Sequence, residues 1–307
     1  MKRVISISLG TSKRDKASKI NLLGQNFEIS RVGTDGDQQK FAGLFSELDG
    51  KVDAFGVGGA DIYVVAKQKK YSFKQIEQLI QGAKKTPVVD GSGLKHTLER
   101  EAIRVLQEKK VLDFSKEKVL LVSAVDRYGM AEALAKYCPN VLFGDLLFGL
   151  GLPIAIRKYH TVESLGSLLL PIVTKLPFQW FYPTGEKQEK STPKFKWAFD
   201  EATVIAGDWH YIRRYAPNRL DGKTIITQSL RKQDIEWLGE AGALMAITTT
   251  PVIEGETFAT NVMEAVLVTL LAKNPLDIQV SEYLEVLKKL EWQPNLIDFS
   301  ETRKKRS

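Results

Sequence analysis

The densest group of titratable side chains in the sequence lies in Asp90–Arg100, directly after a short apolar run. Lys95 and Glu99 are four residues apart, a spacing that forms surface ion pairs on a helix. The alternative is chemical, because a lysine withdrawn from water can act as a general acid or base, with Asp90 orienting it. Since glycines, a hydroxyl and this lysine converge at the end of a predicted strand, we predict Lys95 and Asp90 as catalytic residues.

A second group near the N-terminus could bind an acidic small molecule. Ser8–Asp15 follows an apolar run and combines a glycine, hydroxyls and cations that could face an anion, although a plain surface loop has the same composition. Asp35, in the turn Gly33–Asp37, is either a binding carboxylate or the cap of the helix that follows. With a histidine that follows a later strand, the predicted substrate-binding residues are Ser8, Ser12, Lys13, Arg14, Asp35 and His210.

A third feature is the strand–turn–helix–strand pattern of Val119–Leu134 and Asn140–Asp145. In nucleotide-binding βαβ units a carboxylate about 20 residues after the turn binds the ribose hydroxyls, a role that Asp145 could take. Such a carboxylate favours NAD, whereas Arg127 could serve a 2′-phosphate, so that NADP stays open. Because one of the three fingerprint glycines is present, an ordinary strand–helix–strand without a nucleotide is the alternative. The predicted cofactor-binding residues are Asp126, Arg127, Gly129, Asp145, Gly207 and Thr249.

A glycine cluster in Gly56–Asp61 follows another apolar run and lets the backbone approach a ligand closely. Because Ile62–Ala66 has more strand than helix character, we interpret the cluster as a tight turn that lines a cleft.

The elements that position these groups alternate along the chain. Short apolar runs are separated by segments with helical spacing, which is typical of α/β proteins with mainly parallel sheets. The predicted strands are Val4–Leu9, Phe27–Val32, Val52–Val57, Pro87–Val89, Val119–Ala124, Thr203–Ala206, Thr224–Thr227 and Ala243–Thr248. The predicted helices are Gln38–Leu48, Phe73–Lys84, Leu94–Lys109, Val162–Val173, Lys232–Gly239, Asn261–Lys273 and Ser281–Leu290.

At 307 residues the chain suits two domains. We predict an α/β fold of two Rossmann-like domains with mainly parallel sheets and a cleft between them. Residues 1–117 would form a substrate-binding domain, 118–295 a nucleotide-binding domain and 296–307 a basic tail. The apolar segment 146–182 would either cap the cleft or form the face of a homodimer.

Composition excludes several classes of protein. No run of 18 or more uncharged apolar residues occurs, so no membrane-spanning helix is expected. The single cysteine, Cys138, excludes an internal disulfide, fits a reducing cytoplasm and is expected to be buried packing. With three histidines a zinc site is not expected. The net charge of +7 is concentrated partly in solvated stretches without interleaved aromatic residues, which disfavours nucleic acid as a partner.

Five motifs together resemble bacterial proteins known as quinate or shikimate 5-dehydrogenase-like, over most of the chain. They are Ser6–Asp15, Val32–Asp37, Phe55–Gly59, Thr86–Lys95 and Asp126–Ala131. The resemblance implies an N-terminal substrate domain, a C-terminal NAD(P) domain and hydride transfer at a ring hydroxyl. In shikimate dehydrogenases a lysine and an aspartate of the substrate domain handle the proton, and hydroxyl residues near the N-terminus hold the substrate.

The resemblance carries over to part of this chain. Ser6 and Ser8 match the N-terminal serine pair, and Lys95 is the candidate lysine. Thr34-Asp35-Gly36 resembles the aspartate motif of the family but precedes Lys95, and the glycine-rich dinucleotide loop is absent.

Two functions follow from these observations. The first is a cytoplasmic NAD(P)-dependent dehydrogenase that transfers hydride at a hydroxyl of a small polyhydroxy carboxylate. The second is a non-redox two-domain protein that binds a nucleotide or a phosphorylated metabolite in the cleft.

Overall fold

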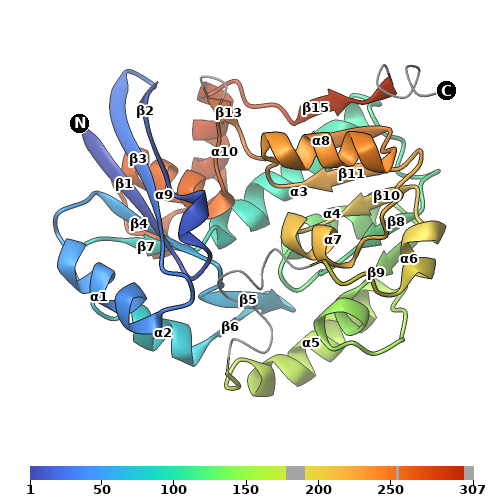
Figure 1. Ribbon diagram of the computed structural model, residues 1–307, viewed down its shortest axis with the longest axis horizontal. Helices are drawn as coiled ribbons and strands as arrows, with labels where there is room; N and C mark the ends of the chain where they lie inside the picture. Colours follow the sequence, from blue (N-terminus) through green and yellow to red (C-terminus); the bar gives the residue numbers. More distant parts are fainter. Residues whose placement is uncertain (178–190, 254–255, 301–307) are drawn as a thin grey trace. The chain divides into compact units, whose positions relative to one another are not determined.

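A computed structural model describes residues 1–177, 191–253 and 256–300 (Figure 1). The described residues fall into two units that alternate along the sequence. The first unit takes its residues from Met1–Thr97, Leu168–Gln188 and Ile253–Trp292, and the second from Leu98–Ser167, Glu189–Val252 and Gln293–Ser307. Helix α3 (Ser92–Glu108) therefore begins in the first unit and continues into the second.

The first unit is built on a five-stranded sheet with the order β2-β3-β1-β4-β7. Its strands are β1 (Lys2–Ser8), β2 (Lys16–Leu22), β3 (Gln25–Gly33), β4 (Ala54–Gly58) and β7 (Val88–Val89). All are parallel except β2, which runs antiparallel to β3. The carboxyl ends of the four parallel strands therefore meet at one edge, where open sheets of this kind bind ligands.

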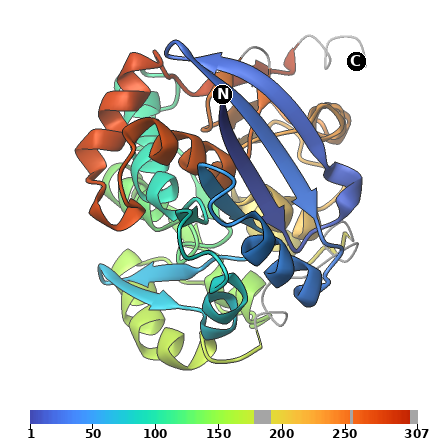
Figure 2. The same cartoon turned by 90° about the vertical axis from the view of Figure 1, so that its left-hand side faces the viewer.

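Helices cover both faces of this first sheet, with α1 and α2 on one face and α9 on the other (Figures 1 and 2). In β4, Phe55 packs edge-on against Phe45 of α1, with ring centroids 5.1 Å apart, whereas its neighbour Gly56 lies against Asn261 of α9. Consecutive strand residues point to opposite faces, so these contacts place the two helices on opposite sides. The elements are α1 (Gln38–Leu48), α2 (Lys74–Ile80), α9 (Thr260–Leu271) and α10 (Val280–Lys289), with a hairpin of β5 (Tyr63–Ala66) and β6 (Lys69–Ser72).

The N-terminus of α1 corrects one prediction. Its cap is Asp37, whose carboxylate accepts a hydrogen bond of 2.9 Å from Lys40 N. Asp35 lies in the preceding turn with a φ of 54° and accepts instead from Ser12 N at 2.8 Å. Both aspartates fit a cap by composition, and the turn geometry decides between them.

The second unit is built on a six-stranded sheet with the order β15-β12-β11-β10-β8-β9. Its strands are β8 (Val119–Leu121), β9 (Val141–Phe143), β10 (Val204–Ala206), β11 (Thr224–Thr227), β12 (Met245–Thr248) and β15 (Asn295–Asp298). All are parallel except β15, which runs antiparallel to β12. The chain leaves β8 for β9 on one side and later returns to β10 on the other, which makes the β8–β10 boundary a topological switch point.

Alternate residues of the second sheet enter two separate cores. On one face of the sheet, Leu121 of β8 packs with Leu134 of α4 and Leu106 of α3. On the other face, its neighbour Leu120 packs with Ile212 of α7 and Leu238 of α8. The remaining described elements, taken over both units, are α4 (Tyr128–Tyr137), α5 (Tyr159–Val173), α6 (Lys196–Glu201), α7 (Trp209–Tyr215), α8 (Lys232–Ala241), β13 (Val252–Ile253), β14 (Glu256–Thr257), the short 3-10 helices η1 (Ser12–Arg14) and η5 (Pro275–Asp277), and the π-helix η2 (Asp145–Gly149).

The predicted α/β class with mainly parallel sheets is confirmed, and each predicted strand and helix has a counterpart within a few residues. Among the described elements that were not predicted are β2, β6, α6, α7, the short strands β13 and β14, and β15. The structure also divides the chain differently from the predicted limits at 117 and 295. Helices α9 and α10 belong to the first unit, because α9 covers β4 and β1, and β15 in the predicted tail extends the second sheet.

Residues 178–182 of the predicted apolar segment and 301–307 of the predicted tail lie outside the described residues. Among the helices that the structure describes, none has the length and apolar character to cross a membrane.

Candidate functional site

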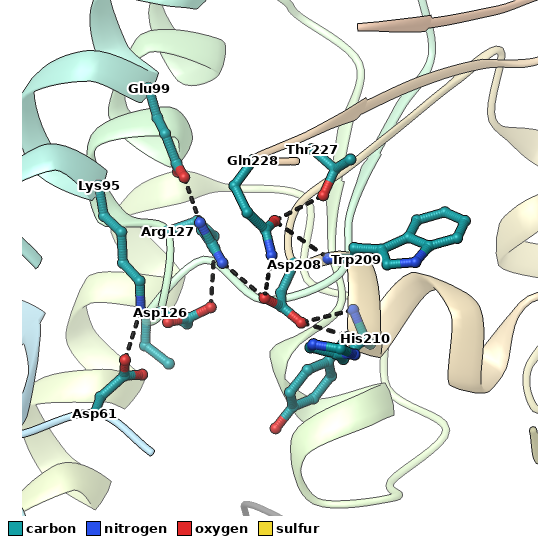
Figure 3. A network of polar contacts seen from close by, with 12 residues as sticks. Asp61, Lys95, Glu99, Asp126, Arg127, Asp208, Trp209, His210, Thr227 and Gln228 are labelled. Carbon is teal, nitrogen blue, oxygen red and sulfur yellow. Dashed lines mark hydrogen bonds and ion pairs between the residues drawn. The ribbon is translucent and has the colours of Figure 1, made fainter. Parts of the chain in front are cut away.

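The first unit places a buried ion pair at the carboxyl edge of its sheet. Lys95 Nζ lies 2.5 Å from Asp61 Oδ1, and the two side chains are 7% and 9% exposed (Figure 3). Asp61 follows β4 through the glycine cluster, and Lys95 stands in the first turn of α3, which follows β7. Because β4 and β7 are parallel neighbours, their ends bring the two residues together.

Asp90 was predicted to orient Lys95, and the structure gives its carboxylate a different set of partners. It accepts hydrogen bonds from Ile62 N at 2.6 Å and Tyr63 N at 3.4 Å, and from Ser92 N at 2.9 Å. Asp90 therefore ties the residues after Asp61 to the start of α3. It positions the ion pair through the backbone, and Asp61 takes the place beside Lys95 that was predicted for Asp90.

A buried lysine–aspartate pair can exchange a proton, since a lysine shifts its protonation state readily when water is excluded. Acid–base catalysis also requires that the group lie within hydrogen-bonding reach of the reacting proton. Both side chains of this pair keep a small exposed fraction, through which a substrate could be reached. The alternative is a structural ion pair, whose breakage would leave an uncompensated charge in the interior.

Glu264 of α9 was missed from the sequence and lies in the same unit. It is 4% exposed, and its Oε1 accepts from Gly93 N and from the Tyr283 hydroxyl, each at 3.1 Å. Burial, with Asp90 nearby, raises the pKa of the Glu264 carboxyl to about 8. The available signal was a single acid within the otherwise apolar stripe of Asn261–Lys273.

The predicted anion loop after β1 binds aspartates of the chain itself. Asp35 accepts from Ser12 N, and Asp15 Oδ1 accepts from Gly33 N at 2.6 Å. The backbone hydrogen bond from Ser12 lowers the pKa of Asp35. The loop is thus bonded to the end of β3 and the turn after it, through the amide of Ser12 and the carboxylate of Asp15.

Of the residues predicted to contact the substrate in this region, the structure gives Ser8 other partners. Ser8 Oγ is buried and accepts from Gly10 N at 3.1 Å and from Arg31 Nη2 at 3.0 Å. Lys13 and Arg14 lie in the turn η1 beside this edge of the sheet, as a contact with a carboxylate ligand would require.

The second unit holds a separate cluster around Arg127, which is 3% exposed (Figure 3). Its Nη1 donates to Glu99, its Nε to Asp126 at 3.0 Å and its Nη2 to Asp208 at 2.7 Å. Arg127 follows β8 and Asp208 follows β10, so their ion pair occupies the topological switch point of this sheet. Gln228, at the end of β11, also donates to Asp208, at 2.9 Å.

His210 was predicted as a substrate contact. The structure places it in the first turn of α7, where its backbone N donates to the capping carboxylate of Asp208 at 2.8 Å. This turn brings His210 to the carboxyl edge of the second sheet, whereas the other predicted substrate residues belong to the first unit.

Three of the residues predicted to bind a dinucleotide, Arg127, Gly129 and Asp145, have other partners or positions in the structure. The Asp145 carboxylate accepts from Ala124 N at 2.9 Å and Val125 N at 3.0 Å, so it closes the turn after β8 instead of leaving that turn for a pyrophosphate. Burial raises the pKa of Asp145 to about 6. Gly129 lies inside α4, and Arg127 is committed to its three carboxylates.

Two further predicted residues lie at the same edge of the second sheet. Gly207 has a φ of 126° and an added Cβ would lie 2.6 Å from a methyl of Val122, so glycine is required there. Thr249 is buried, and its N donates to Thr227 O at 2.9 Å. Cys138 is buried, as expected from the sequence. Among the described residues no group of three or more histidine, cysteine or acidic side chains could hold a metal ion.

Two family models match the sequence. The first, described as a domain of unknown function (DUF8754), matches residues 93–299, which is more than half of the chain. The chain belongs to this family. The second, a domain of unknown function (DUF8753), matches residues 3–90, so that the border between the two models falls at the start of α3. No curated protein matches the sequence.

Solved structures resemble the DUF8754 chain only distantly. An NAD-dependent malic enzyme from Thermotoga maritima has 14% identity over 80% of this chain and 65% of its own, with a TM-score of 0.34. A galactofuranose binding protein has 11% identity over 99% and 97%, with a TM-score of 0.36. A glucose-galactose binding protein from Geobacillus stearothermophilus has 11% identity over 97% of both chains, with a TM-score of 0.37. The chain spans 65% of the length of the malic enzymes, and TM-scores of this size carry no functional argument.

Proposed function

We propose that the chain is an enzyme that acts on a hydroxyl of a small polyhydroxy carboxylate, with Lys95 and Asp61 as the pair that moves the proton. The observation that carries this proposal is the ion pair of 2.5 Å at the carboxyl edge of the first sheet. Asp90 holds the backbone on both sides of the pair, which is the support that a preorganised acid–base pair requires.

The carboxylate of the substrate would meet the cations of the η1 turn, Lys13 and Arg14, which follow β1 at the same edge of the sheet. In the ionised pair Asp61 is the acceptor and Lys95 the donor. To act as the base, Lys95 first releases its proton to solvent while Asp61 stays ionised. It then accepts the proton of the substrate hydroxyl, and the ammonium that forms lies again beside the Asp61 carboxylate, which stabilises that charge.

NAD(P)-dependent hydride transfer is the form of this reaction that the resemblance to quinate and shikimate dehydrogenases implies. The switch point at β8 and β10 supports a ligand there. The bonds of Asp145 to the turn after β8 weigh against its role at the ribose of a dinucleotide, so the second candidate is a non-redox protein that binds a nucleotide or phosphorylated metabolite.

Thermal shifts separate these candidates. Quinate, shikimate, NAD, NADP, ATP and sugar phosphates are added singly, since a true ligand stabilises the chain by mass action. Stabilisation by a polyhydroxy carboxylate supports the enzyme, and stabilisation by a dinucleotide supports its redox form. A response to ATP or sugar phosphates alone favours the second candidate.

Turnover of the carboxylate found in this way tests the residues. Lys95→Met should abolish turnover while the exposed control Lys74→Met, whose side chain is 69% exposed in the same unit, leaves it unchanged. Undiminished turnover in the folded Lys95→Met variant contradicts the assignment.

A further inference from the structure

Helix α9 presses against the first turn of α3 at two glycines. An added Cβ on Gly91 would lie 2.9 Å from Asn261 N, and one on Gly93 would lie 2.3 Å from Glu264 Oε1 and 2.9 Å from the Tyr283 hydroxyl. Gly91 requires glycine, because its φ is 95° and an added Cβ would meet the backbone of α9, whereas Gly93 lies against the side-chain ends of Glu264 and Tyr283. The start of α3 therefore lies in direct contact with α9.

Lys95 belongs to that same turn. Its backbone N donates to Gly91 O at 2.8 Å, which closes the first intrahelical hydrogen bond, and Gly93 lies between the two residues. The amide of Gly93 is the one that donates to Glu264 Oε1. The Glu264 carboxyl is thus bonded directly to the turn that carries Lys95.

Titratable groups from three of the described elements face the Glu264 carboxyl. They are Asp90 from the β7–α3 connection, Tyr63 from β5 and Tyr283 from α10. The second carboxyl oxygen, Oε2, is buried and has no hydrogen-bond partner among the described residues. Ionised Glu264 would place a second negative charge beside Asp90, which the N-terminus of α3 offsets only in part. A neutral carboxyl avoids that repulsion. The protonation state of Glu264 therefore changes the electric field at the first turn of α3 and the strength of the hydrogen bond from Gly93 N.

We propose that Glu264 is a proton-linked positioning residue for Lys95, and that the charge on its carboxyl sets the position of the first turn of α3 through Gly93. The proposal rests on the proposed role of the Lys95–Asp61 pair. Under this proposal the geometry of the Lys95–Asp61 pair changes when Glu264 of α9 gains or loses a proton, and Glu264 itself does not touch the substrate.

The test uses the full chain without ligand, so that it does not depend on the substrate. NMR follows the amide of Gly93 and the Cε signal of ¹³C-labelled Lys95, identified by its loss in Lys95→Arg, from pH 6 to 9. Both signals should show an inflection near pH 8 in the unchanged chain. Glu264→Gln, which keeps an oxygen for Gly93, should abolish that inflection, and the exposed control Glu77→Gln should retain it.

A second variant covers the case in which Glu264→Gln does not fold. Tyr283→Phe removes a hydrogen bond that lowers the pKa of Glu264, so the inflection should move to higher pH. An unchanged inflection at Lys95 in both variants overturns the proposal, as does an inflection confined to Gly93. Failure of the turnover assay with these NMR results intact would instead count against the proposed reaction.

Discussion

Each unit buries one cationic side chain among carboxylates, and the two clusters differ in what they can do. Lys95 in the first unit is a point charge that can lose its proton, and it lies against Asp61. Arg127 in the second unit cannot lose its charge, and three carboxylates each bind a different nitrogen of its guanidinium. The first cluster is suited to moving a proton, and the second to fixing the loops at a switch point.

The largest effect is expected from removal of the arginine. Arg127→Met leaves Glu99, Asp126 and Asp208 without their shared cation, and breaking a buried pair costs about 3–5 kcal/mol of unfolding free energy. We expect a loss at the upper end of that range in urea unfolding at pH 7. Arg127→Lys should restore only part of it, since an ammonium does not reproduce the fork geometry. A stability equal to that of the unchanged chain would contradict a structural role.

A smaller loss is expected at the lysine. Lys95→Met removes the cation that pairs with the buried Asp61 carboxylate, so we expect a loss of about 3 kcal/mol in unfolding free energy. The double variant Lys95→Met with Asp61→Leu should recover most of that loss, because it removes both charges. Urea unfolding of both singles and the double forms a mutant cycle. If the double is no more stable than Lys95→Met, the two residues are not coupled and the comparison between the clusters fails.

The effect that is smallest per measured step is the slope of stability with pH. The pKa of Glu264 is raised to about 8 from an ordinary value of 4.5, so between these values the unfolded chain releases a proton that the folded chain keeps. Stability therefore falls as pH rises through this window, by at most about 1.4 kcal/mol per pH unit for one group. Unfolding free energies measured at pH 5, 6, 7 and 8 should show this slope reduced in Glu264→Gln. A slope that persists unchanged would place the titrating group elsewhere.

The sequence predicted the elements better than it predicted the partners of their side chains. Apolar runs and helical spacing located α1, β11 and the other main elements, because burial of one face or one stripe leaves a local record. The same rules missed β2, whose alternation is weak, and could not show which sheet α9 covers. A helix with an apolar stripe fits the face of either sheet, and the choice depends on contacts such as Gly56 with Asn261.

For the candidate site, too, the sequence predicted the position of a residue better than its partner. That Lys95 follows a strand and begins a helix was readable from residue order. That its partner is Asp61 instead of Asp90 was not, since both follow strands that end at one edge of the sheet. Asp145 was expected at a ribose, but its carboxylate closes a turn of the backbone 20 residues earlier in the chain.

By itself the sequence determined the α/β class, the approximate limits of most elements and the residues that reach strand ends. These properties depend on the period of apolar residues and on the turn chemistry of glycine and aspartate, both local in the chain. The tertiary structure alone decided that Lys95 pairs with Asp61, that Glu264 is bonded to the turn of Lys95 and that Arg127 joins three carboxylates. Such pairings depend on the register of neighbouring strands and on the helix that covers them, which bring together residues as distant in the chain as Gly93 and Glu264, 171 positions apart.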